Sequence, residues 1–269
     1  MTPILLFLAL AATAPATTPA TPLPTHDQAG NRIETFAATP PSGPEGAPPL
    51  HCTADRAWCA EISRDVDQNT SELHVFAGTP SDHPPVVTLA LTTEDEDEEL
   101  ALWPSIVRLA GPNAGVLVGV EHHVTTSYSG GGGGATTLHL IRVRGEEAKP
   151  VLTAPISGAL MIRACFDERD MKARRGACHD EYNFDGELTL DPTTASGPPR
   201  LVYETRATVF PAGASRGGDS TLRGPLRQKD LVTTRDPACS YKRAFAMDPT
   251  SDVYAPDKAL PDCSDYTAP

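Results

Sequence analysis

Residues 116–128, with the sequence VLVGVEHHVTTSY, predict the fold more clearly than any other stretch of the chain. Valines recur at every second position from Val116 to Val120 and again at Val124, while Glu121 and His123 occupy the alternate face. A period of two is typical of a β-strand with one buried face. The apolar run TTLHLIRV, residues 136–143, follows five glycines, so we expect an antiparallel hairpin with a flexible glycine tip at residues 130–134.

Short apolar runs separated by Gly, Pro and Asp continue through the rest of the chain, and long helical periodicity is absent. Residues 72–91 resemble residues 137–156 in pattern and loop length, and two further strand-loop-strand units occupy residues 186–208 and 241–257. These units predict an all-β protein built as an antiparallel meander. Repeated units favour a small propeller-like arrangement, with a β-sandwich as the alternative.

The N-terminal residues predict export. An apolar run from Ile4 to Ala12 is followed by Ala14-Pro15-Ala16, so residues 1–16 are interpreted as a signal peptide and the mature N-terminus is expected between residues 15 and 21. Residues 17–50 are rich in Pro, Thr and Ala and predict an extended, disordered linker. A single all-β domain is expected over residues 51–269. The predicted location is secreted or periplasmic, with no stable membrane insertion after cleavage.

Six cysteines in an exported chain indicate disulfides rather than free thiols. The spacing favours the local pairs Cys52–Cys59, Cys165–Cys178 and Cys239–Cys263. Between the middle pair the sequence DERDMKARRG places acidic residues before basic ones, with Asp167 as a helix cap and Gly176 near the C-terminal end. We therefore expect one short helix that the Cys165–Cys178 disulfide closes.

A formal net charge of −13 argues against nucleic-acid binding, because such a surface is expected to repel phosphate backbones and anionic lipids. A binding partner is expected to be a protein or a component of the cell envelope. The basic residues Arg216, Arg223, Arg227, Lys229 and Arg235 are interpreted as a solvated loop. The face of the predicted helix that carries Arg169, Lys172 and Arg175 is a candidate contact surface.

Two sets of residues could support catalysis. GGDST, residues 217–221, is similar to the Gly-Asp-Ser motif of chymotrypsin-like serine proteases, and His51-Cys52 is similar to their His-Cys pair. That resemblance implies Ser220 as nucleophile, although the glycine after the serine is missing. Alternatively, His123 could face His139 across the predicted hairpin, with Glu121 on the same face, as metal ligands.

Acidic runs offer weaker candidates for a cation site. DVDQN at residues 65–69 lacks the later residues of a calcium loop and predicts a polar turn, and EDEDEE at residues 94–99 predicts a solvated loop. No catalytic, metal or cofactor residue is assigned, and no cofactor is expected. The leading hypothesis is a disulfide-stabilised binding or scaffold module of the cell envelope; the alternative is a hydrolase acting through Ser220 or through His123 and His139.

Overall fold

The computed structural model describes residues 25–39, 48–65, 70–81, 83–93, 98–111 and 113–269. Strands make up 52% of the described residues and helices 7%, and the sheets are antiparallel, so the all-β prediction is confirmed. The finer choice between a propeller and a sandwich stays a prediction. Each of the four strand-loop-strand units predicted from the sequence forms a pair of adjacent antiparallel strands.

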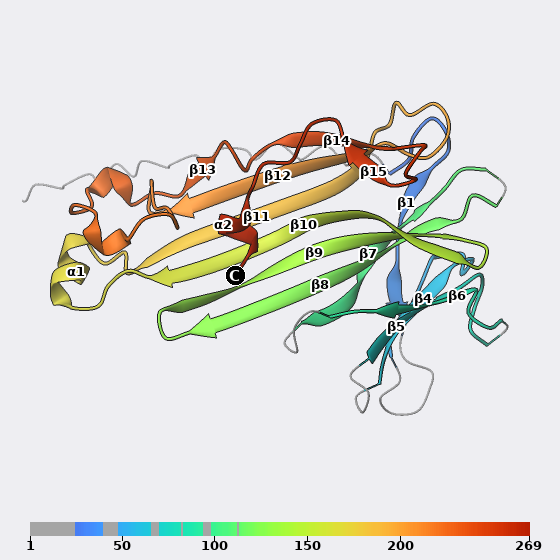
Figure 1. The fold of residues 1–269 in the computed structure, drawn as a ribbon, viewed down its shortest axis with the longest axis horizontal. Helices are drawn as coiled ribbons and strands as arrows, with labels where there is room; N and C mark the ends of the chain where they lie inside the picture. The colour runs from blue at the N-terminus through green and yellow to red at the C-terminus, as the bar shows by residue number, and fades with distance from the viewer. Residues whose placement is uncertain (1–24, 40–47, 66–69, 82, 94–97, 112) are drawn as a thin grey trace, which may run out of the picture.

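The larger sheet has ten strands, nine of them in the order β1-β7-β8-β9-β10-β11-β12-β14-β15, with β13 paired to β12 (Figure 1). Most neighbours in the sheet are consecutive in the chain, which is the predicted meander. The strands are β1 (Arg32–Thr35), β7 (Glu99–Arg108), β8 (Val116–Tyr128), β9 (Gly131–Arg144), β10 (Glu147–Arg163), β11 (His179–Leu190), β12 (Leu201–Phe210), β13 (Thr234–Asp236), β14 (Lys242–Met247) and β15 (Tyr254–Pro256).

The smaller sheet is a five-stranded meander that packs against one end of the larger sheet (Figure 1). Leu73 and Val75 of this sheet share a buried cluster with Val118 and Ile141 of the larger sheet, so burial of these side chains joins the two sheets. The strands are β2 (Ala37–Thr39), β3 (Leu50–Cys52), β4 (Cys59–Asp65), β5 (Thr70–Phe76) and β6 (Val87–Leu91).

The glycine run does not form the flexible tip that we predicted. The turn between β8 and β9 is Ser129-Gly130, and residues 131–134 lie inside β9, paired with β8 on one side and β10 on the other. A Cβ on Gly133 would lie closer than 3.0 Å to the carbonyl oxygen of Ala159. Glycine is therefore needed at residues 131–133 for close approach between neighbouring backbones rather than for a mobile loop.

Part of the predicted linker is also ordered structure. Residues 32–35 and 37–39 form β1 and β2, and between them Phe36 is only 1% exposed. The Nδ2 of Asn31 donates to Asp27 Oδ2 at 2.8 Å, and Asn31 Oδ1 accepts from the backbone N–H of Ala110 at 2.7 Å. Short strands held by backbone hydrogen bonds need few large apolar residues, so composition alone misled the prediction. The predicted signal peptide, residues 1–16, lies outside the described residues.

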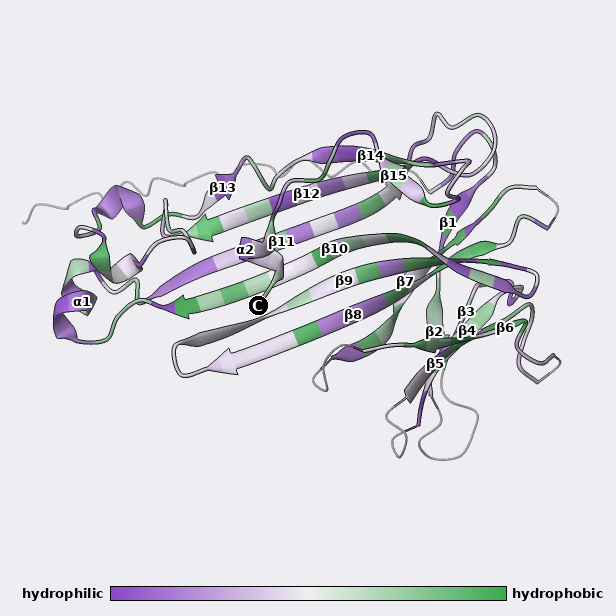
Figure 2. Ribbon diagram, in the orientation of Figure 1, coloured by the Kyte–Doolittle hydropathy of each residue, from purple (hydrophilic) through white to green (hydrophobic). Residues whose placement is uncertain are grey.

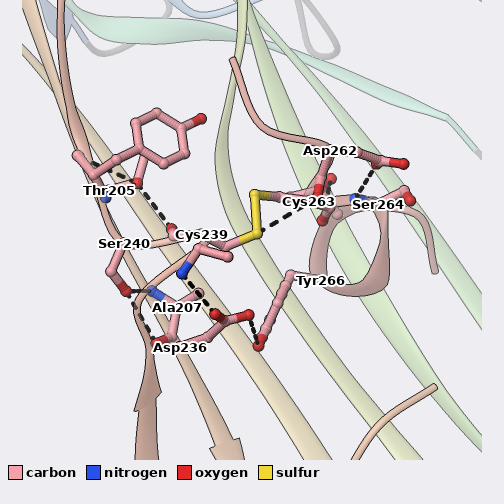
Figure 3. Close-up of a disulfide and its surroundings, with 12 residues drawn as sticks. Thr205, Ala207, Asp236, Cys239, Ser240, Asp262, Cys263, Ser264 and Tyr266 are labelled. Atoms are coloured by element: carbon pink, nitrogen blue, oxygen red, sulfur yellow. Dashed lines mark hydrogen bonds between the residues drawn. A yellow bond between two sulfur atoms is a disulfide. The ribbon is translucent and has the colours of Figure 1, made fainter. Parts of the chain in front are cut away.

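All six cysteines form disulfides, in the pairs Cys52–Cys59, Cys165–Cys178 and Cys239–Cys263 that the spacing favours. The last pair ties the loop after β13 to α2 (Ser264–Thr267), as Figure 3 shows. Tyr266 of α2 packs edge-on against Tyr182 with ring centroids 5.9 Å apart, and its hydroxyl donates to Asp236 at 2.8 Å. The C-terminal segment thereby covers a hydrophobic core that is separate from the cluster between the two sheets and that includes the buried apolar residues of β11 and β12.

The predicted helix is α1 (Glu168–Ala173), and the Cys165–Cys178 disulfide closes it. Asp167 caps its N-terminus by accepting from the backbone N–H of Asp170 at 2.8 Å. Arg174, just after the helix, turns inward to pair with Asp180 of β11. The connection between β12 and β13 contains two single-turn 3-10 helices, η1 (Ser220–Leu222) and η2 (Gln228–Asp230).

Candidate functional site in the cleft between the sheets

Two neighbouring cavities open where the small sheet meets the large one, with volumes of about 390 and 430 Å³. Glu98, only 9% exposed, lines both of them. The first is bordered mainly by β3, β4, β5 and β7, and the second by β6, β8, β9 and β10. We call the two cavities together the inter-sheet cleft. Its walls include apolar residues from both sheets, among them Leu89, Leu91, Val124 and Ile141.

Two histidines meet Glu98 in the second cavity. In the ladder between β8 and β9, His122 pairs with Thr137 and Val120 pairs with His139, so the two imidazoles are diagonal neighbours on one face. Their ring centroids are 4.2 Å apart. His122 Nδ1 is hydrogen-bonded to Glu98 Oε1, and His139 Nδ1 lies 3.2 Å from Thr153 Oγ1.

This arrangement defines what the two rings can present to a ligand. When neutral His122 donates from Nδ1 to the Glu98 carboxylate, its Nε2 is left as a hydrogen-bond acceptor. Burial lowers the pKa of His139 below its ordinary value, and nearby His122 acts in the same direction while Glu98 opposes it. His139 is therefore neutral near pH 7. The second cavity combines one buried carboxyl group, two polar rings and an aliphatic wall.

A third histidine lines the first cavity. His51 lies in β3, and burial lowers the pKa of its imidazole, with a backbone hydrogen bond at Pro49 as the weaker, opposing cause. Its Nδ1 is buried and has no hydrogen-bond partner among the described residues. The cleft thus contains His51, His122 and His139, three of the eight histidines in the chain.

The predicted pairing of His123 with His139 is wrong. His123 lies opposite Thr136 in the β8–β9 ladder, on the face of the sheet opposite to His122 and His139. Its Nδ1 is 3.0 Å from Thr136 Oγ1. Within the described ranges, no group of three or more His, Cys, Asp or Glu side chains is arranged to hold a metal ion. The register, which starts from a turn at Ser129-Gly130 rather than from a glycine loop, decides which histidine meets His139.

The structure also fails to give Ser220 the partners of a serine nucleophile. Ser220 Oγ donates to Asp180 Oδ2, and the other oxygen of Asp180 is paired with Arg174; both charged residues are buried. His51 belongs to β3 of the small sheet, whereas Ser220 accepts from Arg174, the residue directly after α1. Figure 2 shows β3 and α1 at opposite ends of the large sheet. Ser220 therefore serves a buried polar network that anchors the chain after β12.

One Ser-His hydrogen bond that sequence reasoning missed lies elsewhere. Ser63 Oγ is 2.9 Å from His74 Nε2 on the small sheet, where the alternation of β5 turns His74 away from buried Leu73 and Val75. His74 Nδ1 meets Thr88 Oγ1 at 3.1 Å rather than a carboxylate. An orienting acid on Nδ1 is the feature that activates such a pair, so this contact is a cross-strand polar ladder.

The two acidic runs singled out in the sequence are only partly covered by the structure. Residues 66–69 and 94–97 lie outside the described residues, so the predicted polar turn and most of the acidic run have no structural account. Glu98, however, was expected in a solvated loop and is buried in the cleft. The burial of Glu98 could have been inferred from its position directly before the apolar residues of β7, because the chain enters the core there.

Comparison with known proteins adds no assignment to this geometry. No helix in the described part of the chain has both the length and the apolar character needed to cross a bilayer. No family model, curated protein or solved structure matches the chain.

Proposed function

We propose that this chain is an extracytoplasmic binding module and that its ligand site is the inter-sheet cleft. The observation that carries the proposal is Glu98, a buried carboxyl group that borders both cavities and is hydrogen-bonded to His122. Buried polar groups are costly unless they are satisfied, so a cavity that gathers several of them is a default ligand site. Three disulfides support a location in an oxidising compartment.

The lining indicates the class of ligand. An aliphatic wall formed by Leu89, Leu91 and Ile141 suits an apolar body. The Glu98 carboxyl suits a head group that donates hydrogen bonds, and because it is the one carboxyl group among the described residues that line the second cavity, it favours a positive head over a negative one. We therefore propose a small amphipathic amine as the best-fitting class, and an alcohol as the next.

NMR signals from the histidine rings test ligand binding in the cleft directly. Protein labelled with ¹³C at histidine Cε1 is titrated with aryl-alkyl amines, alcohols and carboxylates of matched length. We expect saturable shifts at His122 and His139, strongest for the amines, and little change at exposed His26 and His179. Histidine-to-glutamine variants assign each resonance.

A matched pair of variants separates cleft binding from general association. Thr137→Phe fills the second cavity, which Thr137 lines. Thr125→Phe adds the same ring to the opposite face of the same hairpin. The shifts should disappear in Thr137→Phe and persist in Thr125→Phe. Equal shifts in both variants, or amine-induced shifts at His26 as large as those at His122, would refute the cleft as the ligand site.

A further inference from the structure

The end of the large sheet farthest from the small sheet exposes an unusual number of large apolar side chains. Leu222 is 84% exposed and Phe166 is 61% exposed, and Tyr128, Met161 and Met171 are also exposed there. These five are among the six exposed large apolar residues of the described chain. Single exposed apolar residues are ordinary, but a concentration at one end of a molecule indicates a binding surface.

Contacts between distant segments bring these residues to the same end. Tyr128 pairs with Gly131, and Met161 pairs with Gly132, so both lie at the tip of the β8–β9–β10 strands, on opposite faces of the sheet. Phe166 and Met171 belong to the disulfide-closed segment, and Leu222 belongs to η1. Figure 1 shows α1 and the β8–β9 turn at the same end of the sheet.

The segment around η1 is fixed to the segment around α1 by several interactions. The backbone N–H of Leu226 donates to Ala173 O at 2.9 Å, and Arg175 donates to Gln228 Oε1 at 3.2 Å. Arg174 and Ser220 share the buried carboxylate of Asp180. Two basic segments that appear independent in the sequence therefore form one surface.

The charge of this surface differs from that of the rest of the protein. Residues 163–181 and 211–230 together contain nine of the 22 basic side chains of the chain but only seven of its 35 acidic ones. One acidic and one basic member, Asp180 and Arg174, neutralise each other in the interior. The exposed basic residues are Arg163, Arg169, Lys172, Arg175, Arg216, Arg223, Arg227 and Lys229. We call these residues and the five exposed apolar side chains the basic apolar tip.

We infer that the basic apolar tip rests on the surface of an anionic lipid bilayer. The apolar side chains project from separate turns and strand ends with arginine or lysine between them, and the Arg163 guanidinium lies 5.1 Å from the centroid of the Phe166 ring. Such a mixture suits the bilayer interface, where aromatic and aliphatic groups enter the acyl boundary and basic groups contact lipid phosphates. The acidic remainder of the protein is repelled from that surface and faces away from it.

The membrane contact is separate from the proposed ligand site and determines where that site lies relative to the bilayer. The inter-sheet cleft is lined by residues of the small sheet and of the large one. The small sheet lies at the end of the large sheet opposite to α1 (Figure 1). A bilayer under the tip leaves the cleft open to the aqueous side. The protein is then a peripheral module that holds its ligand site away from the membrane.

Vesicle sedimentation of the full chain tests the inference. Vesicles of phosphatidylcholine with phosphatidylglycerol should sediment the protein at low salt, high salt should release most of it, and pure phosphatidylcholine should retain little. Residues 1–16 are present in every variant, so their apolar run contributes equally throughout. Each basic residue near such a surface contributes about fivefold in affinity, so reversing three tip charges should weaken binding at least a hundredfold.

The tip variant is Arg169→Glu, Lys172→Glu and Arg223→Glu, and the matched control is Arg200→Glu, Lys242→Glu and Lys258→Glu, which makes the same charge change at exposed positions elsewhere. A third variant replaces Phe166, Met171 and Leu222 with serine. Thermal unfolding checks that each variant is folded.

Retained binding in the charge control, together with loss in the tip variant and a marked reduction in the serine variant, would support the inference. Equal loss in the tip variant and its control would overturn it, because binding would then follow net charge alone. Tip-dependent binding to polyglutamate without binding to the anionic vesicles would also overturn it and assign an acidic protein as partner. Thr137→Phe should leave vesicle binding unchanged, so failure of the cleft proposal and failure of the tip proposal are distinguishable.

Discussion

The glycine run gives the sharpest test of the large sheet, because adjacent glycines in β9 have different surroundings. A methyl group added at Gly133 would lie closer than 3.0 Å to the carbonyl oxygen of Ala159 and 3.0 Å from Leu160 Cα, both backbone atoms of β10. A methyl group added at Gly134 would have its nearest neighbour, His123 Cε1, at 3.2 Å. The first contact requires β10 to shift, whereas the second, with the Val124 carbonyl oxygen at 3.3 Å beside it, requires the neighbours to move by only a few tenths of an ångström.

The expected magnitudes follow from these contacts. Overpacking of this kind costs typically about 2 kcal/mol, so Gly133→Ala should lower the free energy of unfolding by that amount. Gly134→Ala reduces the flexibility of the unfolded chain and should gain about 0.5 kcal/mol. For a chain of this size, about 2.5 kcal/mol between the two variants corresponds to a difference of roughly 5–10 °C in Tm.

Urea and thermal unfolding, with the disulfides intact, would measure this difference. If residues 130–134 formed the flexible loop that we first predicted, both substitutions would have similar, small effects. Equal melting temperatures for Gly133→Ala and Gly134→Ala would therefore refute the close β9–β10 pairing that the structure shows.

Four further predictions concern other parts of the molecule. Phe36→Ala should lower the free energy of unfolding by about 3–5 kcal/mol in urea unfolding, because the ring is buried between the sheets, and a loss below about 1 kcal/mol would contradict its burial. Asp180→Ala leaves Arg174 buried without its ion-pair partner and should lower the free energy of unfolding by about 3–5 kcal/mol. Adding Arg174→Met should restore part of that loss. No recovery in the double variant would argue against an unpaired charge as the cause. Burial keeps the pKa of His51 and His139 low in the folded state, so the unfolded chain binds protons first as the pH falls. The free energy of unfolding should therefore decrease as the pH drops below about 6.5. Replacing both residues with Gln should flatten that pH dependence in urea titrations at several pH values. Mass spectrometry of the alkylated but unreduced protein should find no modified cysteine, and any alkylation would contradict the complete pairing.

The strands and disulfides could be predicted because local patterns determine them. The alternation in residues 116–128 predicts β8 with its observed bounds, since each position reports directly on one face of the strand. The capping residue Asp167 and the charge order after it predict α1 in the same way. These features depend on neighbours in the sequence, and the chain around them satisfies the local preference.

The candidate site could not be predicted because it depends on register and on contacts between sheets. His122 and His123 are adjacent, and only the pairing of β8 with β9 decides that His122 shares a face with His139. Glu98 belongs to an acidic run whose composition indicates solvent, yet its position at the start of β7 carries it into the cleft. Similarly, the basic residues near Arg223 gain significance only when η1 is fixed beside α1.

The junction at Phe36 has a consequence for the order in which the protein assembles and opens. One continuous segment provides the edge strand of both sheets, because β1 pairs with β7 and β2 pairs with β3. Its partner in the large sheet is distant in the chain, with Arg32 opposite Arg108, so this segment emerges early during synthesis but can pair only after β7 has been made. Detachment of the same segment uncovers two sheet edges in a single event, and the backbone amides of β1 and β2 should therefore exchange with solvent together.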